Sequence, residues 1–181
     1  PVYPIAIRTP EFFDTVNPLW GSYFATDLRR VAEFLELPLS WPQPDPVVQF
    51  REEGRLRTGD DQPHIHRLTR LGVVAEELGR GIQFADRVSD LIWGGTRNWH
   101  EGDHLARAAA DAGLDLTDLD ARALKDADRL EEVISKNEED HIAACLVDVS
   151  DSLRVFEDSL LSMNFSLISG HLDLLGHHLG R

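Results

Sequence analysis

The stretch from Gln62 to Gly113 constrains the fold most strongly, because its apolar residues have the spacing of three consecutive helices, each followed by a glycine stop. The first apolar stripe ends before Gly79, the second ends before Gly94, and the third begins near Asn98. Helices this short are not stable alone in water. The stretch therefore predicts a helical subdomain whose members pack against one another and against flanking helices.

Two longer apolar stripes flank this stretch and predict helices from Trp20 to Leu35 and from Thr117 to about Leu146, with Thr117 as the N-cap of the second. Between Ser40 and Val47, every second residue from position 42 to 46 is proline. Proline at alternate positions excludes helix and central strand, so this segment is expected to be extended. The charged, glycine-containing segment 51–61 predicts a surface loop.

Strands are expected only near the two ends of the sequence. Alternating apolar and other residues predict strands at Pro1–Arg8, Leu153–Phe156 and Leu161–Leu167, and we expect them to pair in one sheet. A last short helix is expected from Leu172 to Leu179. Because the sequence does not begin with methionine, we expect that it starts inside a longer gene product.

Composition limits the classes of function. The 181 residues, 42% of them hydrophobic, suffice for one core carrying an inserted subdomain. With 32 acidic and 18 basic residues the net charge is −14, which disfavours binding to nucleic acid and to anionic membrane surfaces. The single cysteine, Cys145, excludes an internal disulfide and predicts a reducing compartment, most simply the cytoplasm. No apolar run approaches the roughly 20 residues that cross a bilayer.

The sequence contains one motif typical of zinc hydrolases. His100-Glu101-Gly102-Asp103-His104 matches H-E-x-x-H, which on a helix presents two imidazoles to zinc and a glutamate as base. We expect a helix N-terminus without metal instead, because glycine interrupts the motif and no third ligand follows. A zinc metallohydrolase with His100, His104 and Glu101 in its site is kept as a minor alternative. His171, His177 and His178 are expected to be solvated.

Tryptophans indicate an apolar ligand pocket. Trp41 lies in the proline-rich segment, and Trp93 and Trp99 flank Gly94-Gly95, so the three side chains are expected to line a pocket for an aromatic ligand. An anionic ligand would require a counter-charge, for which we expect Arg30 or Arg97. Cys145 lies in an apolar helical stripe and is expected to be a buried thiol rather than a nucleophile.

Two runs, NPLWGSYFATDLRRVAEFLELPLSWPQPDPV and IHRLTRLGVVAEELGRGIQFADRVSDLIWGGTRNWHEGDHLARAAADAGLDLTDLD, resemble the 2-hydroxychromene-2-carboxylate isomerase and kappa-class glutathione transferase group, which is related to the DsbA oxidoreductases. The resemblance covers roughly Pro4 to Cys145. It implies an α/β fold, with a thioredoxin-like (DsbA-like) domain at 1–15 and 147–181, and a large all-helical insertion at 16–146. It also implies glutathione binding and a homodimer.

Both ends of the sequence depart from the family pattern. The first strand–helix unit, which carries the family's serine, is absent, and Val149-Ser150-Asp151-Ser152 replaces the loop that contains the cis-proline. The catalytic residue therefore stays unknown. For binding glutathione and substrate, we expect Ser150 and Ser152 together with Trp41, Trp93, Trp99 and Arg30.

Two classes of function follow from the resemblance. The first is a glutathione-dependent isomerase of a conjugated aromatic carboxylate. In it, the thiolate of glutathione adds reversibly to the conjugated system, permits bond rotation and is eliminated. The second is a DsbA-like thiol oxidoreductase relative, or a non-catalytic binding protein on the same scaffold.

Overall fold

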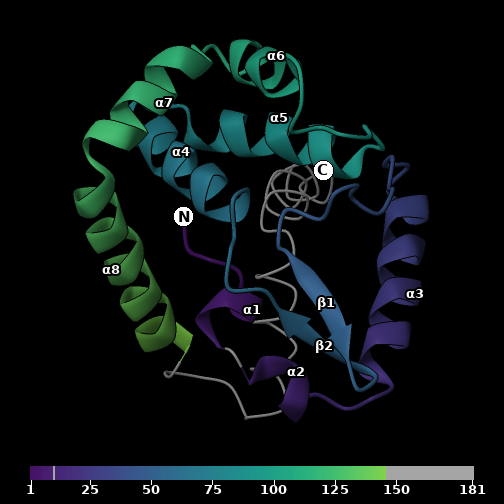
Figure 1. Cartoon of the computed structure of the whole chain (residues 1–181). Coiled ribbons are helices and arrows are strands. Elements are labelled where there is room, and N and C mark those ends of the chain that lie inside the picture. Colours follow the sequence, from purple (N-terminus) through teal and green to yellow (C-terminus); the bar gives the residue numbers. More distant parts are fainter. Residues whose placement is uncertain (10, 146–181) are drawn as a thin grey trace, which may run out of the picture.

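The fold is a mixed α/β arrangement, mostly helical, with one small antiparallel sheet; it is seen in a computed structural model that describes residues 1–9 and 11–145. Figure 1 shows α8 on one side and α3 on the other, with α4 and α5 across the top between them. In chain order the elements are α1 (Ile5–Arg8), α2 (Phe12–Thr15), α3 (Trp20–Phe34), β1 (Gln49–Glu52), β2 (Arg55–Thr58), α4 (Ile65–Glu77), α5 (Gly81–Trp93), α6 (His104–Asp111), α7 (Leu116–Lys125) and α8 (Ala127–Cys145).

Helices α4 to α8 form the main hydrophobic core, which we call the α4–α8 core. Its buried members are residues 71, 73–75, 84, 88, 92, 99, 105, 109, 112, 119, 123, 130 and 134. Leu71, Leu119 and Leu130 are fully buried, and each comes from a different helix. The short helices predicted from the apolar stripes between Gln62 and Gly113 are thus stabilised by packing against one another and against α7 and α8.

Turns between these helices use the residues that such turns require. Gly79 and Gly113 have φ of +71° and +78°, a conformation that glycine adopts without steric cost. The N-cap of α7 is Asp115, whose Oδ1 accepts a hydrogen bond from the backbone N–H of Asp118 at 2.9 Å. The expectation that Thr117 caps this helix is wrong, because Asp115 lies at the position from which a side chain reaches the free N–H groups.

Helix α3 packs elsewhere. Its Trp20 stacks on Phe24 of the same helix and meets Phe12 of α2 edge-on, with ring centroids 5.2 and 5.8 Å apart. None of the buried residues of the α4–α8 core belongs to α3. The predicted helix is confirmed, but its apolar face contributes little to the main core.

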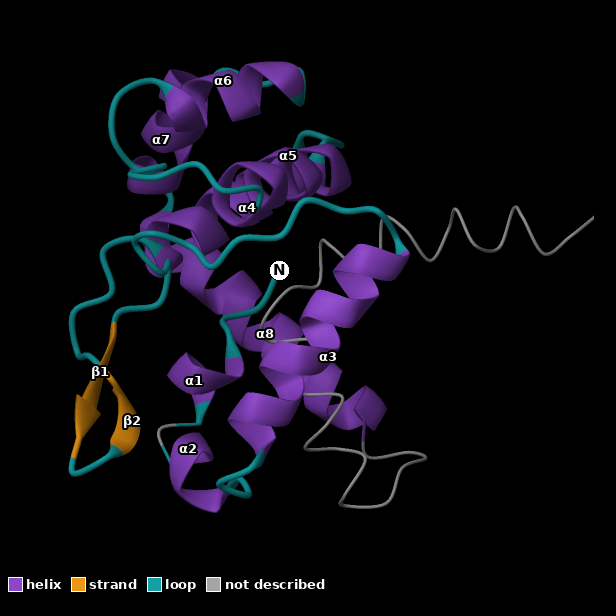
Figure 2. Cartoon of the chain, turned by 90° about the vertical axis from the view of Figure 1, so that its right-hand side faces the viewer, coloured by secondary structure: helices purple, strands orange, loops and turns teal. Residues whose placement is uncertain are grey.

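Segment 51–61, predicted to be a loop, forms much of a hairpin in which β1 pairs antiparallel with β2. Glu53 and Gly54 connect the strands with φ of +50° and +82°, as in a type I′ turn. Charge obscured these strands in the sequence, because none of their described residues is fully buried and no alternation of apolar and polar residues results. Figure 2 shows the hairpin at the edge of the described part of the chain. The insertion at 16–146 is therefore not all-helical, and the boundaries of the proposed domains stay a prediction.

The strand predicted at Pro1–Arg8 is wrong, because Ile5–Arg8 forms the short helix α1. Pro4 ends the extended N-terminus, and its carbonyl accepts hydrogen bonds from the N–H groups of Ile7 and Arg8. Proline cannot donate to a strand ladder, and four alternating residues are too few to distinguish a strand from a buried turn of helix. The other two predicted strands and the helix Leu172–Leu179 lie outside the described residues.

The extended N-terminus is held against α8. The Tyr3 hydroxyl donates to Glu131 Oε1 at 2.7 Å, and Arg70 Nε of α4 donates to the same oxygen at 2.6 Å. The Tyr3 backbone N–H donates to Glu138, and Asn137 Nδ2 donates to the carbonyl oxygen of Pro1. These contacts fix the N-terminal segment on the α4–α8 core.

Candidate functional site

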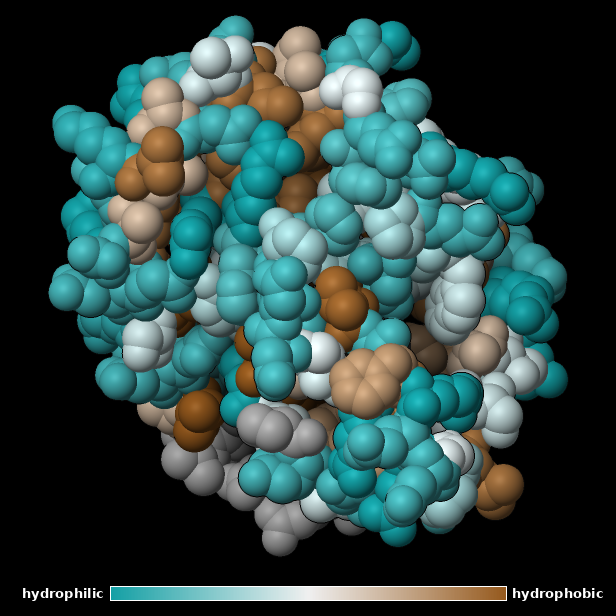
Figure 3. Space-filling model, in the orientation of Figure 1, coloured by the Kyte–Doolittle hydropathy of each residue, from teal (hydrophilic) through white to brown (hydrophobic). Residues whose placement is uncertain are grey.

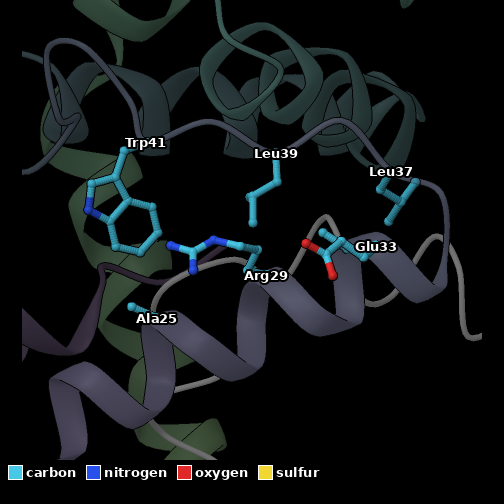
Figure 4. A pocket seen from close by; sticks show the side chains of 7 residues that line it. Ala25, Arg29, Glu33, Leu37, Leu39 and Trp41 are labelled. Atoms are coloured by element: carbon cyan, nitrogen blue, oxygen red, sulfur yellow. The ribbon is translucent and has the colours of Figure 1, made fainter.

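A cavity lies between α3 and the segment that follows it. Its volume is about 440 Å³, and we call it the α3 pocket. Figure 4 shows Ala25, Arg29 and Glu33 on the helix facing Leu39 and Trp41 on the returning segment. Among the described residues, the lining consists of Ala25, Arg29, Ala32, Glu33, Leu37, Leu39 and Trp41.

The pocket exists because the chain reverses sharply after α3. Glu36 has φ of +56°, and the N–H of Leu37 donates to the carbonyl of Ala32 at 2.9 Å, as in a Schellman C-cap. The segment then runs back along the helix, where the N–H of Ser40 donates to the carbonyl of Trp93 at 2.7 Å. The reversal and this anchor to α5 set the width of the pocket.

Trp41 closes one end of the pocket and is 55% exposed. Its ring meets that of Trp93 edge-on, with centroids 5.6 Å apart. The structure therefore brings together two of the three tryptophans that the sequence analysis selected. A partly exposed indole can stack on an aromatic ligand.

Of the residues that the structure describes, one cation and one anion line the α3 pocket. Arg29 and Glu33 lie one helical turn apart, and neither forms an ion pair within the part of the chain that the structure describes. In Figure 4 the guanidinium of Arg29 extends toward Trp41. Arg30, selected from the sequence, is exposed and does not line the pocket, because adjacent helical residues point about 100° apart. Arg97 is exposed and does not line it either.

Trp99 has a different environment. Its side chain is 1% exposed, and its Nε1–H donates to the carbonyl of Pro44 at 2.8 Å. Trp99 thus ties the proline-rich segment to the α4–α8 core instead of lining the α3 pocket. The ring of His64 lies against its indole, with centroids 5.3 Å apart.

A smaller cavity of about 180 Å³, which we call the imidazole pocket, lies beside Trp99. It is lined by Pro63, His64, Arg67, Leu68, Trp99, His100 and Leu105. Burial lowers the pKa of His64, and the neighbouring His100 and Arg67 lower it further. The pairing of His64 with His100 could not be predicted from the sequence. The two residues lie on separate segments, which come together only because α4 packs against the turn before α6.

The His100–His104 motif does not form a helix. Helix α6 begins at His104, and Gly102 has φ of +60° in the preceding turn, so the third helix does not begin near Asn98 as expected. The two imidazoles of the motif are therefore not one helical turn apart, as a zinc-binding H-E-x-x-H requires. Among residues 1–9 and 11–145, no group of three or more His, Cys, Asp or Glu side chains could hold a metal ion.

Several expected site residues lie outside the described part of the chain: Ser150, Ser152, His171, His177 and His178. Helix α8 ends at Cys145, whose side chain is not among the described ones. Their roles stay predictions.

Comparisons with protein-family models, with curated proteins and with solved structures found no match to this chain. In the described residues, no helix combines the length and the apolar character needed to cross a membrane. Most of the face drawn in Figure 3 is hydrophilic, and apolar residues show through it in small separate groups.

Proposed function

We propose that the protein is a glutathione-dependent isomerase of the 2-hydroxychromene-2-carboxylate isomerase type, acting on a conjugated aromatic carboxylate in the cytoplasm. The resemblance of the two quoted runs supports the family and the thioredoxin-like fold. The observation that carries the substrate class is the α3 pocket, whose lining includes both the guanidinium of Arg29 and the indole of Trp41 (Figure 4). Arginine binds carboxylates through paired donors, and tryptophan provides a flat apolar surface for a ring.

In this proposal the carboxylate of the substrate lies on Arg29 and its ring lies on Trp41. Leu37 and Leu39 exclude water from one side of the ring. Glu33 repels a second negative charge at the opposite end, so an acid with one carboxylate is preferred over a dianion.

The lining of the α3 pocket fits the substrate better than it fits glutathione. Thiolate formation requires a hydroxyl, a cation or a backbone N–H group at the sulfur. No serine, threonine, tyrosine or cysteine is among the described lining residues, and the one cation among them, Arg29, is assigned to the carboxylate of the substrate in this proposal. We therefore derive no step through glutathione from these residues. Ser150 and Ser152 stay its proposed partners.

This lack of a hydroxyl or thiol group in the described lining supports a second candidate, a binding protein without catalysis on the same scaffold. The two candidates share the α3 pocket and differ in turnover.

The homodimer implied by the resemblance belongs to the first proposal, and the exposed apolar side chains of Leu19, Tyr23 and Phe34 on and beside α3 offer surface for a partner. Light scattering of the purified chain tests it, and a monomeric mass at all concentrations would contradict it.

Calorimetry with cinnamate as the probe tests the substrate site. We expect one binding event that Arg29→Gln weakens at least tenfold, because the carboxylate loses its only cation in the described pocket, whereas Arg30→Gln changes it less than twofold. No binding at millimolar cinnamate, or equal weakening by both variants, would contradict the site.

Turnover separates the two candidates. The isomerase proposal expects that the ultraviolet spectrum of a cis-configured conjugated aromatic acid changes with time only when both the protein and glutathione are present. Binding of cinnamate without such turnover would favour the non-catalytic protein.

A further inference from the structure

The imidazole pocket brings together two histidines from distant parts of the sequence. His64 precedes α4, and His100 lies in the turn before α6. Their ring centroids are 4.7 Å apart, and the ring planes are inclined by 58°. Both rings also contact Trp99, which is almost fully buried, so the pair is supported by the core.

This separation matches that of two imidazoles that share a metal ion. Imidazole nitrogen binds late first-row metals at about 2.0 Å. With N–metal–N angles between a right angle and the tetrahedral value, the two ring centroids then lie roughly 4.5–5.2 Å apart. The observed 4.7 Å falls within that range.

One nitrogen of the pair has no partner. Nδ1 of His100 is buried and accepts or donates no hydrogen bond within the described residues. The other nitrogen, Nε2, lies 3.7 Å from Glu101 Oε1. A carboxylate beside one ring nitrogen favours the tautomer with its proton there, which leaves the opposite lone pair available, and this is the usual arrangement around metal-binding histidines.

We propose that His64 and His100 bind one late first-row divalent cation, of the class of Zn²⁺, Ni²⁺ and Cu²⁺, with water at the remaining positions. Imidazole suits these metals, and the net charge of −14 attracts cations. Arg67 is the nearest opposing charge. Its guanidinium is held by both carboxylate oxygens of Asp120, at 2.9 and 2.7 Å, which offsets its repulsion of a cation.

Two protein ligands imply weaker binding than the three or four of catalytic and structural zinc sites. The site therefore differs from the zinc hydrolase motif in its ligands, because it uses His64 in place of His104. It also stands independently of the proposed isomerase activity.

Zinc titration of the whole chain, followed by ¹H–¹⁵N correlation of the histidine rings, tests the proposal site by site. We expect the ring nitrogens of His64 and His100 to shift together with one apparent dissociation constant. We expect His64→Gln and His100→Gln each to raise that constant at least tenfold, and His104→Gln to change it less than twofold. If a variant fails to fold, the shifts of the His64 and His100 resonances in the wild-type protein test the site by themselves.

Three results would overturn the site. One is unchanged His64 and His100 resonances at millimolar zinc. Another is a joint shift of His100 and His104 without His64, which would restore the hydrolase motif. The third is a zinc dissociation constant that neither His64→Gln nor His100→Gln changes.

Discussion

The α4–α8 core and the α3 pocket are built from helices of similar amphipathic sequence, but they use their apolar residues differently. In the core, Leu71, Leu119 and Leu130 are completely buried. On α3, Phe34 is 82% exposed, and Trp41 opposite the helix is 55% exposed. An apolar stripe thus predicts a helix in both regions but does not predict what covers it. Among the described residues, the less covered region is also the one that lines the α3 pocket.

The largest expected effect concerns the core. Leu119→Ala in α7 should lower the free energy of unfolding by about 2–5 kcal/mol, because it leaves a cavity among fully buried neighbours. Leu124→Ala in the same helix is the matched control, since Leu124 is 83% exposed, and should change it by less than about 0.5 kcal/mol. Urea denaturation measures both. Equal losses would mean that α7 does not pack as described.

A smaller effect is expected where the N-terminus joins the core. Tyr3→Phe should lower the free energy of unfolding by about 1–2 kcal/mol, because Glu131 loses a hydrogen bond. Tyr23→Phe on α3 serves as control, since its ring is exposed and its hydroxyl forms no hydrogen bond to residues 1–9 or 11–145. Thermal unfolding measures the difference. If Tyr3→Phe behaves like the control, the N-terminal segment is not held on the core.

Removing the N-cap of α7 should lower the free energy of unfolding by about 1 kcal/mol. Asp115→Ala removes the acceptor of the Asp118 N–H, whereas Thr117→Ala should have a clearly smaller effect. Urea denaturation of the two variants decides between the residues. A larger loss for Thr117→Ala would restore the assignment made from the sequence.

The smallest expected effect is an acid dependence of the N-terminal contacts. Burial alone raises the pKa of Glu131, but hydrogen bonds from Tyr3 and Arg70 outweigh it, so that this pKa lies below the usual 4.5. A carboxyl group with a lowered folded-state pKa stabilises the fold above its unfolded pKa and loses that contribution as the pH falls through the folded value. Since Glu131 is 40% exposed, the contribution should stay below about 1 kcal/mol.

Unfolding free energies between about pH 5 and pH 2 measure this dependence. Glu131→Gln should make the free energy of unfolding less dependent on pH in this range. Glu132→Gln, at an exposed neighbouring position, should leave the pH dependence unchanged. An unchanged slope in Glu131→Gln would exclude the assignment.

Much of the helical part could be predicted from the sequence, because its determinants are local. The stripe of α3 predicted that helix within a few residues, and the glycines after α4 and α6 predicted where those two helices end. The hairpin β1–β2 could not be predicted in this way, because its turn has a positive φ at the non-glycine residue Glu53 and its Arg55 and Arg57 form ion pairs with Asp14 of α2. These pairings join positions far apart in the sequence.

The candidate site was predictable only in part. Trp41 and a nearby arginine could be selected from residue type and local context. The choice of Arg29 over Arg30 depends on the direction in which the chain reverses after α3, which the positive φ of Glu36 sets. A glutamate at such a position gives no sequence signal, unlike a glycine. The pairing of His64 with His100 depends on tertiary packing and had no local signal at all.

Hydrogen exchange of the whole chain, measured by mass spectrometry with and without cinnamate, tests most directly the claim that a stable core supports a ligand site at α3. Without ligand, amides of α4, α5 and α8 should exchange most slowly and those of α3 faster, since buried packing protects the former. Cinnamate should then slow exchange between residues 25 and 41 and leave the core unchanged. Protection that appears only in the core, or a free α3 that exchanges as slowly as α4, would contradict the account.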